Sequence, residues 1–314
     1  MFITKANQAA INPVLTKLAI AFPQQGLVAE KLSPPVDVGE ENEDGTYFLF
    51  DKTNLQGGYE DVRALGTQAA TFDWNLETAT YHCEEHTLEK PIDWREFKQW
   101  KKYLDVAVTS QEITLEILLL NYDVRIATLF TTALNYAATH TRGLGVGTFW
   151  DDFINSDPEG DVETAREIIA VDAGEPNTIA IPVRIWRVVR RHPAIRALVR
   201  EMDSRQLTED GFPARLFGLR AVYPGARQNT VMPGVAESIQ RIWADNVWIG
   251  IVNPRPTKRT LSFSYTFRAK GMQVETYEDT RKKSDVIRVQ HQISDEEIVA
   301  QDAGYLLTNV TLAG

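Results

Sequence analysis

The stretch that decides the fold runs from Gly174 to Asn253: it opens with Gly174-Glu-Pro-Asn177-Thr-Ile-Ala-Ile-Pro182, and its last motif is Ile242-Trp243-Ala244-Asp245-Asn246. Between these ends lie Trp186, His192-Pro193-Ala194-Ile195, Leu216-Phe217-Gly218-Leu219, Tyr223-Pro224-Gly225-Ala226 and Gln228-Asn229. The pattern predicts a short buried strand at 178–181, helical pieces at 183–191 and 194–202 divided by Pro193, and a strand at 247–252. Nothing in the stretch has the spacing of a catalytic motif. It therefore indicates a mixed α+β unit without an active site of its own.

Composition sets the broad class of the chain. It has 314 residues, of which 43% are hydrophobic and 24% charged, enough for one large or two smaller domains with an ordinary core. The single cysteine, Cys83, excludes an internal disulfide. Polar residues and a proline interrupt the first apolar stretch, and no apolar run approaches the roughly 18 residues that span a bilayer. We expect neither a secretion signal nor a membrane partner.

Charge is distributed unevenly along the chain. The net charge of -10 argues against a sequence-reading nucleic-acid binder, which needs clustered Lys and Arg to displace counterions from phosphates. Residues 1–89 hold 14 acidic and 5 basic residues, whereas residues 184–205 hold seven arginines against Glu201 and Asp203. Two interpretations remain open: contacts between copies of the chain, and two solvated faces of opposite sign.

The amino-terminal third predicts an arm followed by a long projecting hairpin. Residues 1–33 mix short apolar stretches with prolines, and a strand is expected at 36–38. Residues 39–90 form the hairpin, with a strand at 47–50 and an extended return limb at 71–88 that is rich in Thr and aromatic residues. A loop of this length without its own core is uncommon in a monomer, so a neighbouring subunit is expected to support it.

Helical periodicity dominates the middle of the chain. A helix is expected after Asp93, with Glu96 three residues on as in a capping box. The longest helix is expected from Thr109 to about Ala138, closed off by Gly143-Leu-Gly145-Val-Gly147 acting as a helix stop and hinge. Its apolar stripe is Ile113, Ile117, Leu120, Val124, Ala127 and Thr131, with Leu118, Tyr122, Arg125 and Leu129 beside it. A further helix is expected at 162–172 and late strands at 262–268, 273–277, 286–291 and 305–310.

The run Tyr81-His82-Cys83-Glu84-Glu85-His86 offers three types of metal ligand but the wrong geometry. In a strand, His82 and His86 share a face yet lie roughly 13 Å apart, and Cys83 points to the other face. A zinc ion needs its ligands within about 2.3 Å. We expect no metal here.

The remaining chemical motifs also favour structural roles. The glycines at 143, 145 and 147 follow a helix and lack the Gly-Lys-Ser/Thr of a phosphate-binding loop. No Gly-x-Ser-x-Gly elbow is present, and Cys83 is expected in an exposed hairpin and not in a cleft. Asp151 and Asp152 are interpreted as turn and cap residues. We expect no catalytic residue and no cofactor.

Arg184, Arg187 and Arg191 fall on one face of the helix predicted at 183–191. Such a face could bind phosphate or the carboxylates of a neighbouring subunit.

Residues 150–268 carry a resemblance to a known family. Trp150-Asp-Asp, then Asp157-Pro158 and Asp161-Val162 before a helix, precede Gly174-x-x-Asn177-Thr and the motifs quoted above. Pro254-x-Pro256 and Ser262-Phe263-Ser264-Tyr265-Thr266-Phe267 follow them. In this order the segments resemble the major capsid proteins of tailed double-stranded DNA phages, which have the Hong Kong 97-type shell fold.

The resemblance implies an α+β subunit with a defined layout. An amino-terminal arm would occupy residues 1–33, an extended loop with flanking peripheral strands 34–90, and the spine helix with peripheral elements 91–173. The axial domain would occupy 174–255, and 256–314 would return through the peripheral domain. Some relatives carry a cleaved scaffolding segment or Lys–Asn cross-links. This chain begins almost directly at the arm, which implies a separate scaffold or a different trigger, and nothing marks Lys52 or Asn309 as reactive.

The implied function is assembly of an icosahedral phage head that encloses double-stranded DNA, made in the bacterial host cytoplasm. Implied partners are further copies in hexamers and pentamers, a scaffolding protein, a portal, a decoration protein in some relatives, and DNA contacted non-specifically. Candidate intersubunit contacts are Tyr47, Phe50 and Trp74 in the loop, and Arg187 and Arg191 in the axial domain. Two alternatives stay open: an encapsulin-like compartment, and a soluble hydrolase with a site around His82 to His86.

Overall fold

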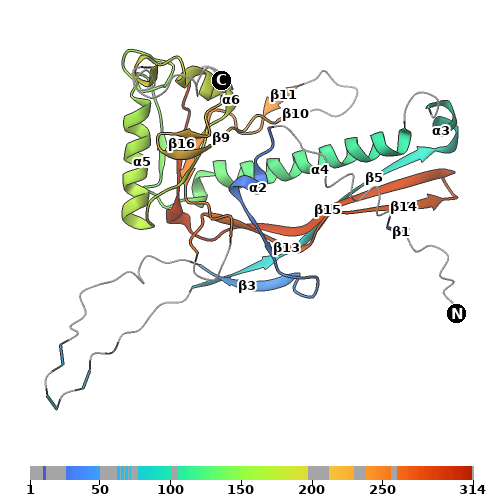
Figure 1. Ribbon diagram of the computed structural model, residues 1–314, viewed down its shortest axis with the longest axis horizontal. Helices are drawn as coiled ribbons and strands as arrows, with labels where there is room; N and C mark the ends of the chain where they lie inside the picture. Colours follow the sequence, from blue (N-terminus) through green and yellow to red (C-terminus); the bar gives the residue numbers. More distant parts are fainter. Residues whose placement is uncertain are drawn as a thin grey trace.

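Two sheets and one long helix organise the chain. The computed structural model describes residues 10–11, 26–49, 62–63, 65–66, 68–69, 71, 77–100, 105–196, 212–229, 238–255 and 260–312. Helix α4 runs along the first sheet and reaches the second, and a hairpin root projects away from both (Figure 1). The described residues are therefore mixed helix and strand, as the sequence predicted.

The first sheet is built around its longest strand, β15. Its order is β1-β14-β15-β13-β2, and β5 also pairs with β15. All its pairings are antiparallel except that of β13 with β2. The strands are β1 (Ala10–Ile11), β2 (Pro35–Asp37), β5 (Glu84–Asp93), β13 (Ser264–Lys270), β14 (Gln273–Asp279) and β15 (Ser284–Ile298).

The second sheet draws its strands from distant parts of the chain. Its order is β6-β16-β12-β7-β9-β8. The strands are β6 (Thr141–Gly143), β7 (Thr178–Ala180), β8 (Arg215–Leu216), β9 (Leu219–Val222), β12 (Val247–Gly250) and β16 (Gly304–Thr308). The strand expected at 178–181 is fully buried as β7, and the five strands expected between 247 and 310 are all present, within a few residues at most ends. Strand β16 pairs with β12, so the chain's last strand completes this sheet and not the first.

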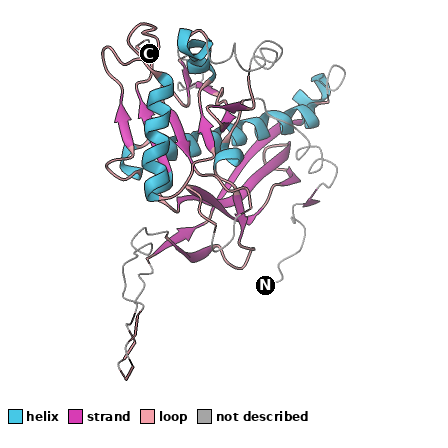
Figure 2. Ribbon diagram, turned by 60° about the vertical axis from the view of Figure 1, so that its left-hand side comes forward, coloured by secondary structure: helices cyan, strands magenta, loops and turns pink. Residues whose placement is uncertain are grey.

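Helices cover the second sheet on both faces. Side chains at alternate positions along β12 point to opposite sides: Val247 and Ile249 join one apolar cluster, and Trp248 joins the other. The first cluster packs under α5 (Pro158–Asp172) and α6 (Val183–Val189), and Figure 2 shows α5 in front of the strands. The second packs under the carboxyl-terminal half of α4 (Val106–Thr131) and the short α2 (Ala29–Leu32). Both faces of the sheet are thus buried.

Glycines make room for the aromatic side chains of the second cluster. Gly250 and Gly304 lie opposite each other in the β12–β16 ladder. A Cβ on Gly304 would lie 2.6 Å from Phe263, and one on Gly250 would lie 2.6 Å from the carbonyl oxygen of Ala303. A larger residue at either position would displace backbone or a ring, so glycine is required by close packing.

Helix α4 departs from the prediction at both ends. It begins at Val106 because the Asp105 side chain accepts a hydrogen bond from the Val108 N–H and caps it. It ends at Thr131, where extended backbone at Thr132 leads into the 3-10 turn η2 (Ala133–Asn135). The expected end near Ala138 and the expected glycine stop are therefore wrong, since Gly143 lies in strand β6.

The buried stripe of α4 shares only Ala127 with the one predicted. Its large side chains are Leu115, Leu118, Tyr122, Ile126 and Phe130, at steps of three and four. Leu115 and Leu118 pack on the first sheet, whereas Ile126 and Phe130 pack on the second. Ile113 and Ile117 of the predicted stripe are 54% and 45% exposed. The helix therefore fixes one sheet to the other through one face and leaves apolar side chains on another.

A buried carboxylate fixes the amino-terminal segment to α4. The Asp123 Oδ1 atom accepts hydrogen bonds from the N–H groups of Val28 (2.8 Å) and Ala29 (3.0 Å) at the start of α2. Burial raises the pKa of Asp123 to about 6, although both N–H donors act in the opposite direction.

No helix among the described residues has the length and apolar character that crossing a membrane requires.

Candidate assembly surfaces

The root of the predicted hairpin is fixed to the first sheet by aromatic packing. Strands β3 (Asp44–Phe48) and β4 (Thr78–His82) pair antiparallel. Tyr81 stacks on Phe267 of β13 at a centroid distance of 4.5 Å, and Tyr47 packs on the same ring at 5.0 Å. The Tyr47 hydroxyl donates to the carbonyl of Ile298 (3.3 Å), and burial, followed by the charge of Glu297, raises the Tyr47 pKa above its ordinary value. The hairpin therefore leaves the sheet in a fixed direction.

Of the three candidate contact residues in the loop, the structure describes Tyr47. Tyr47 is half-buried in its own chain and anchors the hairpin, which the sequence did not predict. Its predicted contact with a neighbour stays a prediction. Phe50 and Trp74 lie outside the described residues. The outward face of the hairpin carries Phe48, which is 54% exposed.

The possible hydrolase site does not come together. His82 is exposed and bonds the Asp44 carboxylate, which is the main reason that its pKa is raised. Cys83 points to the other face, as expected, but it is buried and not exposed: its Sγ donates to the carbonyl of Phe267 at 3.4 Å, and burial raises its thiol pKa. His86 lies on β5 and is half-buried. The three side chains thus have three separate environments.

Asp152 is a turn residue, as predicted, whereas Asp151 contacts a distant part of the chain. Asp152 accepts from the N–H groups of Ile154 and Asn155, and Asp151 accepts from the N–H of Leu312. These bonds hold the turn before α5.

A histidine and an arginine share the junction of α4 with β15. Arg125 forms a two-point ion pair with Glu296, at 2.9 and 3.1 Å. The nearby His291 is buried, and burial, then the charge of Arg125, lowers its pKa to about 4. The junction is therefore built for a neutral His291.

The predicted arginine face divides into one paired and two exposed side chains. Arg184 Nη1 bonds both carboxylate oxygens of Asp245, at 2.8 and 3.1 Å. This pair lies within the chain, so Arg184 is not the free intersubunit contact or phosphate ligand that the helical face suggested. Arg187 and Arg191 are exposed, and neither has an ion-pair partner among the described residues. Both remain candidate contacts.

A basic groove lies between α6 and the hairpin formed by β10 (Arg227–Asn229) and β11 (Ile239–Arg241). Its main depression has a volume of about 440 Å³. We call this surface the arginine groove; its charged lining residues are Arg184, Arg187, Arg227, Arg241 and Asp245. The sequence did not predict it, because β10 and β11 are short, polar and without alternation.

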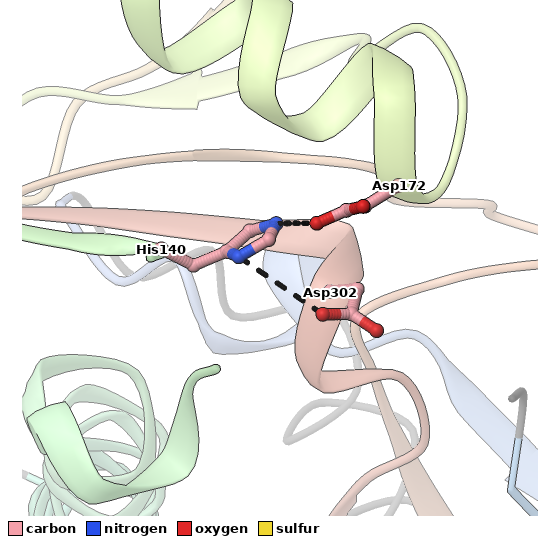
Figure 3. A group of neighbouring side chains, drawn as sticks. All are labelled: His140, Asp172 and Asp302. Carbon is pink, nitrogen blue, oxygen red and sulfur yellow. Dashed lines mark ion pairs between the residues drawn. The ribbon is translucent and has the colours of Figure 1, made fainter. Parts of the chain in front are cut away.

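A buried histidine lies between two aspartates where three elements meet (Figure 3). The His140 Nε2 atom is 3.7 Å from Asp172 at the end of α5, and Nδ1 is 4.0 Å from Asp302 in η3 (Gln301–Ala303). The carboxylates approach different ring nitrogens, whereas a metal ion binds a single nitrogen in the ring plane. The arrangement therefore fits a polar junction between three segments better than a metal centre. No local motif signals it, since the residues are far apart in sequence.

Comparison with known proteins identifies relatives of this chain. No protein-family model matches the chain. The major capsid protein of Burkholderia phage BcepMu is 25% identical over 307 residues, covering 96% of each chain. The major capsid protein of Pseudomonas phage JBD67 is 26% identical over 238 residues, covering 74% of each. The chain is a relative of phage major capsid proteins. These relatives are structural proteins, in agreement with the expectation that the chain is not an enzyme.

Solved structures share the fold of this chain. A phage-related protein from Bordetella bronchiseptica RB50 superposes with a TM-score of 0.75 at 24% identity, covering 98% of this chain and 100% of that one. The capsid protein of Cyanophage P-SCSP1u gives a TM-score of 0.64 at 10% identity, covering 98% and 92%. The SrpI encapsulin of Synechococcus elongatus PCC 7942 gives 0.51 at 12% identity, covering 97% and 98%.

Proposed function

We propose that the chain is a major capsid protein that assembles with copies of itself into an icosahedral phage head around double-stranded DNA. The observation that carries this proposal is the match, along 96% of the chain, to a protein named as a major capsid protein. The described surface supports it, because Ile113, Ile117 and Phe48 are large apolar side chains left exposed. Repeated weak contacts through such surfaces would give the shell its stability.

The proposed domain layout follows the order of elements. Helix α4 is the spine helix, the first sheet belongs to the peripheral domain, and residues 34–90 form the extended loop that lies over an adjacent subunit. The axial domain is centred on residues 174–255, with β6 and β16 joining its sheet, and α5 packing on it, from outside that range. Axial domains meet around the fivefold and quasi-sixfold positions of the shell.

Further partners belong to the same proposal. A separate scaffolding protein, a portal and a decoration protein would act in the host cytoplasm and on the particle. Packaged DNA would be contacted weakly and without sequence preference, since the chain carries a net charge of -10.

Electron microscopy of the protein, expressed alone and together with a candidate scaffolding protein, tests the proposal. Closed shells are expected, and a uniformly monomeric protein would contradict it. The encapsulin likeness gives a second candidate function, a compartment for enzymes. Shells that enclose one enzyme and no DNA during infection would favour this second candidate over a phage head.

A further inference from the structure

The arginine groove holds positive charge that the described residues do not neutralise. Its charged lining comprises four arginines and one acid, Asp245, whose carboxylate is already occupied by Arg184. Arg187, Arg227 and Arg241 have no ion-pair partner among the described residues. In a chain of net charge -10, such a concentration of free arginine side chains favours an anionic ligand.

The β10–β11 hairpin brings two of these arginines close together. Arg227 and Arg241 are directly opposite each other in the β10–β11 register. Like charges in this position destabilise a strand pair, because their side chains lie side by side. A carboxylate placed between them would remove the repulsion and add charge-assisted hydrogen bonds. The groove is therefore more stable when occupied by acidic groups.

The same unit carries a matching acidic surface on α5. Glu159, Glu163 and Glu167 are exposed and follow each other at four-residue steps, so they form one row about 12 Å long. We call this row the α5 acidic stripe. The opposite flank of the helix, with Val162, Ala165 and Ile169, is buried against the second sheet. Repulsion within such a row costs a few tenths of a kcal/mol per pair, which a basic partner would offset.

Internal pairing leaves most of the stripe available. Of the three glutamates in the stripe, Glu163 alone forms an ion pair with another described residue, Arg166 at 3.0 Å, and its side chain is still 66% exposed. Val171, one further step along, is 73% exposed. Ile239 at the rim of the groove is 62% exposed, so each surface also has one apolar side chain.

The two surfaces lie at different edges of the unit. Figure 1 shows α5 at one edge and the β10–β11 hairpin at another, with strands of the second sheet between them. They cannot meet within one chain while both keep these positions. Complementary surfaces at different edges of one subunit give a head-to-tail contact, and a rotation that closes then gives a ring.

We propose that the arginine groove binds the α5 acidic stripe of a second copy, and that this contact sets the ring of axial domains. The inference rests on the proposed function, because it names the partner of a surface in the shell subunit. Arg227 and Arg241 would face Glu159 and Glu167, with Arg187 at the edge of the contact.

Paired charge reversals test this contact. One variant carries Arg227→Glu and Arg241→Glu, a second carries Glu159→Lys and Glu167→Lys, and a third carries all four changes. Each two-site variant is expected to lose assembly by roughly tenfold or more, because like charges then face each other. The four-site variant is expected to regain it. A control with Glu278→Lys and Arg281→Glu, both exposed at the far end of the first sheet, is expected to assemble normally.

Mixing the two two-site variants gives the most stringent test of the contact. Each variant alone places like charges together at every contact, whereas alternating copies restore opposite charges at all contacts of an even-membered ring. Sedimentation is expected to show rings in the mixture and none in either variant alone. Circular dichroism and the thermal midpoint of each variant check that its fold is intact.

The outcomes separate the inference from the proposed function. If the wild-type chain never assembles, the proposed function fails. If it assembles and the two-site variants do so equally well, the groove contact is overturned. Loss of assembly that neither the four-site variant nor the mixture reverses would also overturn it.

Discussion

The register of α4 gives a sharp prediction, because two isoleucines on one helix have opposite environments. Ile126 is fully buried between the helix and the second sheet, whereas Ile117 is 45% exposed. Ile126→Ala removes three buried carbons, a loss of about 2.4 kcal/mol in transfer free energy at ~0.8 kcal/mol per group. The cavity that remains brings the expected total to about 3–4 kcal/mol. Ile117→Ala is expected to change the free energy of unfolding by less than about 1 kcal/mol.

Urea unfolding of the unassembled subunit, followed by circular dichroism, measures this difference. The substitution is identical in both variants and the helix propensity change is the same, so only the environment of the side chain differs. Assembly supplies a second readout: Ile117→Ala is expected to weaken shell formation more than it weakens the subunit. Equal losses of stability in the two variants, or a larger loss for Ile117→Ala, would refute the packing of α4 described above.

Three further predictions address single groups. The pKa of His291 is 6.5 in the unfolded chain and about 4 in the folded chain, so the free energy of unfolding falls as the pH drops between these values. Between pH 7 and 5, the wild type is expected to lose about 2 kcal/mol more of this free energy than His291→Gln. Parallel pH curves for the two proteins would contradict this. Asp123→Ala is expected to lower the free energy of unfolding in urea by about 2–3 kcal/mol, because it leaves the Val28 and Ala29 N–H groups unpaired. Asp123→Asn keeps an acceptor oxygen and is expected to cost less. Equal losses in the two variants would argue against these hydrogen bonds. The Cys83 thiol is expected to react with a thiol reagent only as the chain unfolds, and rapid labelling of the native subunit would show that it is accessible.

Strands could be predicted from the sequence where burial follows a simple period. β7 and β12 are short apolar runs, and both lie in the sheet with every residue buried. β13 to β16 were found for similar reasons, and turn residues separate them. The polar strands β10 and β11 gave no such signal, because their pairing depends on the surrounding structure and not on alternation.

The face of α4 could not be read from periodicity alone. Apolar residues occur on more than one side of the helix, and the row with Ile113 and Ile117 is exposed. A monomer would rarely leave such a row in water, whereas a subunit that meets neighbours can. The assumption that the most regular apolar row is the core therefore failed at a surface proposed for assembly.

Charged contacts were the hardest features to predict. Arg184 pairs with Asp245, and His140 lies between Asp172 and Asp302, across separations that no local motif spans. The sequence located the arginine-rich segment but not the hairpin opposite it. Only the folded chain shows that Arg227 and Arg241 face each other.

A cryo-electron microscopy reconstruction of assembled particles tests the central claim most directly. We predict a closed icosahedral shell in which the 34–90 loop of each subunit lies over a neighbour and the axial units form rings. Particles of this kind would establish the chain as the shell subunit. A protein that stays monomeric with its scaffold present, or that forms open aggregates without icosahedral order, would contradict the claim.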